Sequence, residues 1–234
     1  MREKLKVESE IYKVDKEGSN IKANATVTLS GENSGALLKI NNVKVIEGKN
    51  GIFVALPTRE IVNKETNEKR YEPVIRFDEK TFIESTNENG ETEKKSWLEN
   101  MIKGSVKRAF ESPELKDEKI TKDERVDSEQ VNVWASSTAK NNTVYLGGII
   151  NIPNVFLNES KEGEKYVKMP SYSFEKDGEK KYKDYVYAPA ETMREKIKEA
   201  VIKARENIQE KEKQNEQESN INEAEDEDDL DLPF

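Results

Sequence analysis

The stretch that decides the fold is Val43–Glu60, "VKVIEGKNGIFVALPTRE". Two apolar runs flank the turn sequence "EGKNG", in which Gly48 and Gly51 supply the backbone freedom that a tight reversal needs. Apolar character continues up to Pro57, where the missing backbone N–H ends the pairing of a strand. The stretch therefore predicts a β-hairpin.

The sequence on either side of this hairpin completes a small α+β unit. Upstream, "KLKVESEIYKV" and "IKANATVTLSG" alternate apolar and polar residues around the turn sequence "DKEGSN", which predicts two further strands. Downstream, "SWLENMIKGSVKRAFES" places its apolar residues at helical spacing, with Ser96 as the predicted N-cap. These patterns predict an antiparallel sheet followed by a helix.

The same order of patterns returns in the second half of the chain. Residues 112–130 contain few apolar side chains and are interpreted as a linker. Strand patterns then restart at Val131, and the glycines of "LGGII" are interpreted as a bulge or a close backbone approach within an apolar strand. A second amphipathic helix, "AETMREKIKEAVIKARENIQEK", follows, and after it the composition predicts disorder.

The two halves also match in detail, which indicates an internal duplication. The counterpart of the opening stretch is "PNVFLNESKEGEKYVKMPSYS", in which a strand, a glycine-bearing turn and an apolar-Pro ending recur. The aligned residues are Val54 with Val167, Leu56 with Met169, Pro57 with Pro170, and Thr58 with Ser171. The predicted division is residues 1–111 and 131–213 as domains, 112–130 as linker and 214–234 as tail.

These residues resemble the SpoVG family of small bacterial proteins. "IKANATVTL" and "VKVIEGKNGIFVALPTR" are similar to its core, and the later "KMPSY", "DGEKKYKDY" and Pro189–Ile197 are similar to its Met-Pro-Ser, acidic-turn and helix-entry segments. The resemblance implies α+β domains that bind DNA or RNA as regulators, usually as homodimers paired through their sheets. The fold predicted here is two tandem SpoVG-like domains, each an antiparallel sheet with a C-terminal helix, acting as an intramolecular pseudo-dimer.

Composition excludes several kinds of chemistry. The chain has no cysteine and no histidine, so disulfides, thiolate or imidazole metal sites and Cys- or His-based catalysis are excluded. Its acids show no paired spacing typical of an acid–base or metal site, and "EGKNG" is not a phosphate-binding loop. We therefore predict a protein that is not an enzyme and uses no cofactor. The lack of an 18-residue apolar run or signal peptide predicts a cytoplasmic location without membrane contact.

The tail carries the whole net charge of the chain. The net charge is −9, and the segment from Gln214 onward contains nine acids and no lysine or arginine. Its ending, "DEDDLDLPF", resembles the C-terminal tip of bacterial single-stranded DNA-binding proteins, which recruits replication, recombination and repair enzymes. A terminal ring and carboxylate suit a pocket with an apolar floor and a basic lip. The predicted tip consists of Asp228, Asp229, Leu230, Asp231, Leu232, Pro233 and Phe234.

The predicted nucleic-acid contacts combine basic side chains with aromatic rings, because single-strand binding needs both. The richest mixture is "KYVKMPSYSFEKDGEKKYKDYVYAP" in the second half. For Phe53, within an apolar run, a core position is predicted instead. The candidate contacts are Lys44, Lys49, Arg59, Lys165, Lys168, Tyr172, Lys180, Lys181, Tyr182, Lys183 and Arg194.

The sequence thus favours a protein that binds single-stranded DNA through the body and recruits DNA-processing proteins through the tip. RNA or duplex DNA stays open as the ligand, and so does further assembly along a strand. One alternative is a SpoVG-type regulator of transcription or of RNA. Another is an adaptor whose acids mimic DNA and which binds no nucleic acid. The high Lys, Asn and Glu usage fits a low-GC bacterium, its phage or a mobile element.

Overall fold

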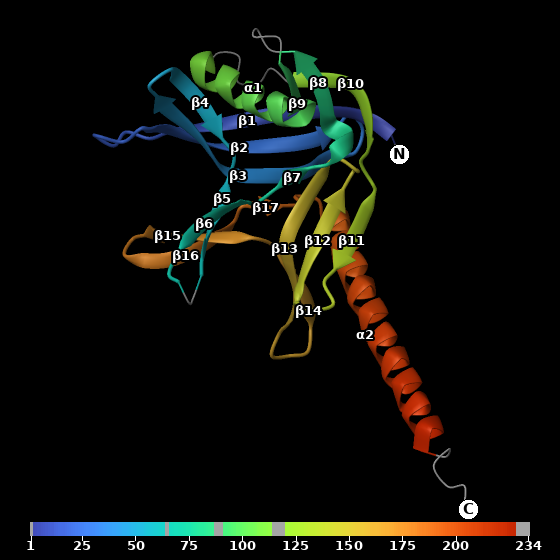
Figure 1. Ribbon diagram of the computed structural model, residues 1–234. Helices are drawn as coiled ribbons and strands as arrows, with labels where there is room; N and C mark the ends of the chain where they lie inside the picture. Colours follow the sequence, from blue (N-terminus) through green and yellow to red (C-terminus); the bar gives the residue numbers. More distant parts are fainter. Residues whose placement is uncertain (1, 64–65, 87–90, 114–119, 228–234) are drawn as a thin grey trace, which may run out of the picture.

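The computed structural model describes residues 2–63, 66–86, 91–113 and 120–227, and shows antiparallel sheets with two α-helices (Figure 1). The predicted α+β class is therefore confirmed. The first sheet has the order β10-β1-β2-β3-β17, and β4 also pairs with β3. Its strands are β1 (Arg2–Lys13), β2 (Ile21–Gly31), β3 (Gly35–Gly48), β4 (Gly51–Ala55), β10 (Ile120–Asp127) and β17 (Val186–Tyr187).

The predicted hairpin is the β3–β4 pair, in which Gly48 lies opposite Gly51. Helix α1 (Trp97–Glu111) packs on β1, and its N-cap is Ser96 as predicted, because the Ser96 Oγ accepts a hydrogen bond from the Glu99 N–H at 3.2 Å. Between β4 and α1 lie η1 (Glu79–Thr81) and the hairpin of β8 (Phe82–Thr86) and β9 (Thr92–Ser96).

Part of the predicted linker is a strand. β10, within the segment 112–130, pairs antiparallel with β1 from Arg2 to Val7. The linker prediction is therefore wrong for Ile120–Asp127, whose high charge is typical of an edge strand. An edge strand needs only one apolar face, so a strand at the edge of a sheet can have a high content of charged residues. Val126 is a buried residue of β10.

The second sheet is also antiparallel. Its order is β11-β12-β13-β14, and β7 also pairs with β13. The strands are β11 (Val131–Ala135), β12 (Asn141–Leu146), β13 (Ile150–Glu159), β14 (Lys165–Lys168) and β7 (Arg76–Phe77). The glycines of "LGGII" do not form a bulge: Gly147 and Gly148, with φ values of 61° and 65°, make the tight turn from β12 to β13.

Each half of the chain places one short strand in the sheet of the other half. β7 comes from the first half and pairs with β13, placing Phe77 opposite Ile150. β17 comes from the second half and pairs with β3, placing Val186 opposite Ile40. The buried side chains of both halves form one hydrophobic cluster. The predicted domains at 1–111 and 131–213 are therefore interlocked, with strands exchanged in both directions.

The two central strands carry the same irregularity. In β3 the register with β2 shifts near Asn42, and in β13 the register with β12 shifts near Asn154. Both asparagines adopt a left-handed backbone, with φ of 59° and 61°. Asparagine tolerates this conformation better than most residues, and such a β-bulge bends a strand locally. The exchanged strands pair immediately before these bulges.

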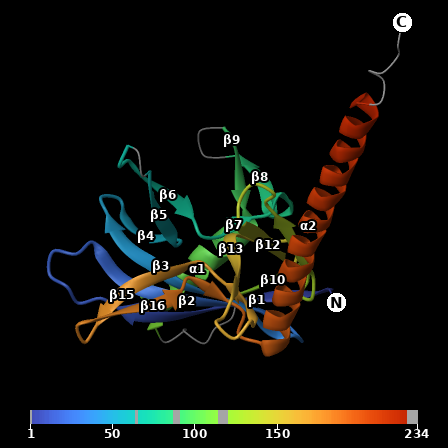
Figure 2. The same cartoon turned by 90° about the horizontal axis from the view of Figure 1, so that it is seen from below.

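Two hairpins extend from the same side of the molecule, and we call them the arms. The first arm is β5 (Thr58–Val62) with β6 (Lys69–Pro73), and the second is β15 (Ser171–Lys176) with β16 (Glu179–Asp184). Both lie on the left in Figures 1 and 2. Each arm begins directly after Pro57 or Pro170, whose carbonyl accepts a hydrogen bond from Val74 or Tyr185.

Helix α2 (Glu191–Glu227) leaves the body on the opposite side from the arms (Figures 1 and 2). The Arg205 guanidinium holds it to the second sheet by donating to the carbonyls of Ser136, Ala139 and Asn141 at 2.8, 3.0 and 2.6 Å. The helix continues past Lys213, into the segment that the sequence predicts to be disordered, and Glu and Gln in that segment favour helix.

Candidate nucleic-acid interface

The two arms, and likewise the β3–β4 and β13–β14 hairpins, carry exposed aromatic side chains at corresponding positions of the two halves. Tyr71 on β6 and Tyr182 on β16 lie at corresponding positions, and they are 64% and 69% exposed. Phe53 on β4 and Tyr166 on β14 also correspond, and they are 51% and 46% exposed. The structure thus offers two pairs of accessible rings, one ring of each pair from each half.

The placement of Phe53 corrects the prediction that it lies in the core. Its neighbour Val54 is 7% exposed, so alternation along β4 turns the ring of Phe53 away from the core. Neither Phe53 nor Tyr71 was selected from the sequence. The aligned halves carried a usable signal, because Phe53 aligns with Tyr166 and Tyr71 with Tyr182.

Most of the predicted basic contacts lie near these rings. Lys180, Lys181 and Lys183 are on the second arm with Tyr182, and the Lys180 ammonium lies 5.7 Å from the centre of the Tyr182 ring. Lys181 also forms an ion pair with Glu179 at 3.5 Å. Lys49 is exposed in the turn between β3 and β4, and Lys44 is half-buried on β3.

Three other predicted contacts have structural partners. The ring of Tyr172 is half-buried, with its centre 4.7 Å from that of Tyr185, and burial raises the pKa of its hydroxyl. The Arg194 guanidinium donates to the carbonyls of Ala188 and Pro189 at 3.2 and 2.6 Å, which fixes the entry to α2. Lys165 lies 3.9 Å from Glu206 on α2.

The last two predicted contacts, Arg59 and Lys168, come from different halves and line one cleft. This cleft has a volume of about 400 Å³ and lies where the first arm meets β13 and β14. The structure therefore brings together two cations that are 109 positions apart in the sequence.

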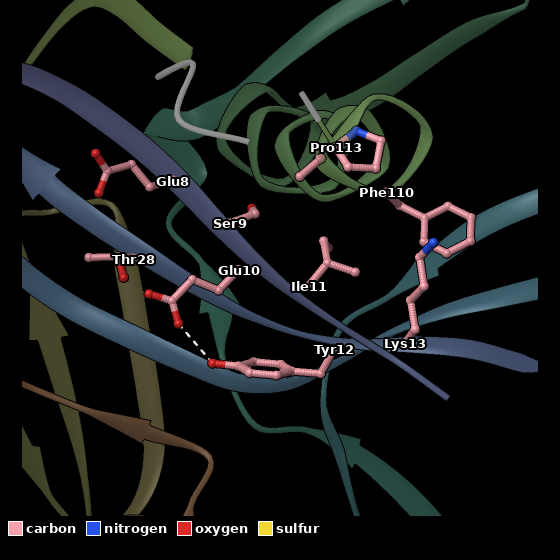
Figure 3. Close-up of a pocket in the computed structure, with 10 residues that line it drawn as sticks. Glu8, Ser9, Glu10, Ile11, Tyr12, Lys13, Thr28, Phe110 and Pro113 are labelled. Atoms are coloured by element: carbon pink, nitrogen blue, oxygen red, sulfur yellow. Dashed lines mark hydrogen bonds between the residues drawn. The ribbon is translucent and has the colours of Figure 1, made fainter. Parts of the chain in front are cut away.

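A larger cavity of about 700 Å³ lies between the C-terminal half of β1 and the C-terminal end of α1 (Figure 3). Glu8 and Glu10 line it, and the Tyr12 hydroxyl donates to Glu10 at 2.8 Å. That hydrogen bond, together with burial and the negative charge of Glu10, raises the pKa of Tyr12. Two carboxylates beside one lysine, Lys13, repel phosphate, so this cavity is a poor nucleic-acid site.

The described part of the chain shows neither a metal site nor a membrane span. No group of three or more acidic residues there is arranged to hold a metal ion. None of its helices combines the length and apolar character needed to cross a membrane. The predicted tip, residues 228–234, lies outside the described residues.

The described residues define an α+β protein with antiparallel sheets, two hairpin arms and two α-helices. A family model described as SpoVG matches residues 5–84. A protein of Clostridium novyi (strain NT) named "Putative septation protein SpoVG" is 34% identical over 93 residues, which cover 35% of this chain and 87% of the relative. The chain therefore belongs to the SpoVG family, which is not a known family of enzymes. No solved structure matched the chain.

Proposed function

We propose that this protein is a single-chain pseudo-dimer of two SpoVG copies that binds single-stranded DNA on the arm side. In this proposal the C-terminal tip recruits replication, recombination and repair proteins. The observation that carries it is the pair of arms on one side of the molecule, with Tyr71 and Tyr182 exposed at corresponding positions.

Two features support a second SpoVG copy in residues 131–213, beyond the 5–84 match. The bulges at Asn42 and Asn154 occupy the same place in β3 and β13. The exchanged strands β7 and β17 pair with these two strands in the same register relative to the bulge. Such reciprocal exchange is how two identical subunits would pair, and a duplication converts it into contacts within one chain.

Single-strand binding is supported by the kind of side chains on the arm side. Exposed rings stack on bases of any sequence, each contributing about 1–3 kcal/mol, and flanking lysines neutralise phosphates. The second arm combines Tyr182 with Lys180, Lys181 and Lys183. The first arm is more nearly neutralised, because Lys69 and Glu60 form an ion pair at 3.1 Å.

The course of α2 favours a tail that recruits partner proteins over a tail that competes with nucleic acid for the arms. The nine acids begin at Glu216, and those up to Glu227 belong to a helix that leads away from the arms (Figure 1). Negative charge held at that distance attracts a basic partner surface and speeds encounter. It competes little for the arms at physiological salt, where charges are screened beyond about 8 Å.

Fluorescence anisotropy tests the body. Labelled single-stranded dT oligonucleotides, an RNA of the same length and a random duplex are titrated at 50 and 200 mM salt. The proposal expects tightest binding to the single strand and weaker binding at higher salt. Failure to bind any of the three at low salt, with or without residues 214–234, would support the adaptor alternative.

Family membership specifically favours a second function, that of a SpoVG-type regulator. That function predicts preference for one duplex or RNA sequence over random sequence. Competition between pooled duplexes separates the two functions, because a stacking interface discriminates little among sequences.

Deletion of Phe234 tests the tip. Pull-down from lysate with the full chain and with the deletion variant should differ in the recovered DNA-processing proteins. Oligonucleotide affinity should stay within about twofold, since the tip follows α2 in the sequence and α2 leads away from the arms. Recovery of the same proteins by both would contradict recruitment through the tip.

A further inference from the structure

The cleft between the halves is lined by groups of complementary kinds. Arg59 enters from the first arm, and Lys168 from β14. The neighbouring strand β13, on which Phe156 pairs with Lys168, contributes Asn154, Phe156 and Asn158. A cleft of about 400 Å³ lies within the range of small-ligand sites.

The charge around the cleft leaves a positive excess. One Glu72 carboxylate serves two arginines, since its Oε2 lies 3.2 Å from Arg59 Nη2 and its Oε1 lies 3.2 Å from Arg70 Nη2. Near Lys168 the acidic group is Asp184, whose pKa is raised by burial more than Lys168 lowers it. The residues that line the cleft therefore include two cations and no carboxylate, and of the two nearby carboxylates Asp184 is disfavoured in its charged form.

The neutral groups of the cleft suit a base. The Phe156 ring is half-buried on β13, so one part is held by the protein and another part is accessible. The Asn154 and Asn158 amides each offer a donor and an acceptor, although the Asn154 Oδ1 already accepts from Asn141 at 3.3 Å. Cations, amides and a ring together form the set of groups that recognises a nucleotide.

The corresponding place in the first half is filled by protein. There Tyr172 occupies the position of Arg59, and its ring packs on Tyr185, whose hydroxyl donates to the Thr58 carbonyl at 3.2 Å. Phe156 follows Asn154 by two residues, and the residue in the same relation to Asn42 is Lys44. Beside β13 the arm supplies the cation, Arg59, and the strand supplies the ring, Phe156. Beside β3 the arm supplies the ring, Tyr172, and the strand supplies the cation, Lys44.

We infer that this cleft seats one nucleotide of the bound strand, with its phosphate between Arg59 and Lys168 and its base against Phe156. The inference rests on the proposed single-strand binding and adds an anchor to it. It makes binding asymmetric: one half holds a nucleotide in a cleft, while both halves offer exposed rings for stacking.

The test uses the full chain and a fluorescein-labelled dT20 at salt concentrations from 50 to 200 mM. Lys168→Gln should weaken binding about 3- to 10-fold and reduce the slope of log K against log salt by about 0.7, the value for one single-strand phosphate contact. Phe156→Leu should weaken binding about 5-fold or more with an unchanged slope. Lys103→Gln on α1 removes the same charge away from the cleft and should leave both quantities unchanged.

Cross-linking supplies an independent readout. A dT20 carrying 5-iodouracil should cross-link to Phe156 on irradiation, and peptide mapping by mass spectrometry identifies the residue. If wild type binds dT20 while Lys168→Gln and Phe156→Leu match it in affinity and slope, the cleft inference is wrong and the proposed function stands.

A different result would separate the two proposals. If wild type binds no oligonucleotide, the proposed function fails, and titration with dTMP then decides about the cleft. Shifts of the Asn154 and Asn158 side-chain amide resonances would support a site for a free nucleotide. Unchanged resonances at millimolar dTMP would overturn the inference.

Discussion

The two halves of the molecule share a backbone plan and differ in the side chains placed on it. Both have a bulged central strand, an exchanged short strand and an arm that follows a proline. They differ at the start of each arm. Tyr172, on the second arm, packs on Tyr185, whereas Arg59, at the corresponding place on the first arm, lines a cleft. The exchanged strands constrain the backbone of both halves, because each must pair with a strand of the other half. The side chains at corresponding positions are under no such constraint and can differ in function.

The largest effect should come from charging an exchanged strand. Ile75 and Val186 precede or begin β7 and β17 at corresponding positions and are 2% and 0% exposed. Ile75→Asp or Val186→Asp buries a carboxylate without a partner, so each should lower the free energy of unfolding by about 4 kcal/mol or more. Urea denaturation followed by circular dichroism measures this, and each variant should unfold in one transition.

Ile83→Asp is the matched control, because Ile83 on β8 is 46% exposed. Its expected cost is within about 0.5 kcal/mol. Two separate transitions, with only one affected by Ile75→Asp, would mean that the halves fold independently and that the comparison of interlocked halves is wrong.

The sequence predicted the elements that local patterns determine. The β3–β4 hairpin follows from its glycines, and the start of α1 follows from Ser96. The exchange could not be predicted, because β7 and β17 are two-residue strands whose only distinguishing property is a partner distant in sequence. For the same reason the sequence selected Arg59 and Lys168 separately, and only the fold places them in one cleft.

The next effect concerns Asn41, which the second half replaces with Pro153. The Asn41 Nδ2 donates to the Asp184 carbonyl at 2.8 Å, and its Oδ1 accepts from Thr26 at 3.1 Å. Asn41→Ala removes both hydrogen bonds and should cost about 2–3 kcal/mol in urea denaturation. A double-mutant cycle with Thr26→Val should show coupling, because that variant already removes the hydroxyl that donates to Asn41. Strict additivity would show that the Asn41–Thr26 hydrogen bond contributes nothing to stability.

The exposed rings test whether the halves contribute equally to binding. Phe53→Ala and Tyr166→Ala should each weaken binding of dT20 by about 1–3 kcal/mol, while the free energy of unfolding changes by less than about 1 kcal/mol. Anisotropy and urea denaturation measure the two quantities. Trp134→Ala, at a ring 57% exposed on β11 outside the matched pairs, is the control and should leave affinity unchanged. An effect of Tyr166→Ala alone would confine stacking to the second half.

The smallest effect is a dependence of stability on pH that comes from Glu3. The turn from β2 to β3 is held by Glu3, which is 3% exposed and accepts from the N–H groups of Asn33 and Ser34 at 2.6 and 3.0 Å. Burial raises the pKa of Glu3, but hydrogen bonds from Ser128, Ser34 and Asn33 lower it further, so its pKa lies below the ordinary value.

A lowered folded-state pKa stabilises the protein above the unfolded pKa of about 4.3, and this contribution disappears as pH falls through the folded value. Glu3→Gln should therefore cost about 1–2 kcal/mol at pH 7 and progressively less toward pH 3. Thermal denaturation of both proteins between pH 3 and pH 7 measures this. The turn between β12 and β13 relies on Gly147 and Gly148 and contains no titrating group, so Gln130→Ala beside it should shift Tm equally at every pH. A constant difference between wild type and Glu3→Gln across that range would show that the carboxylate of Glu3 does not carry the stability of its turn.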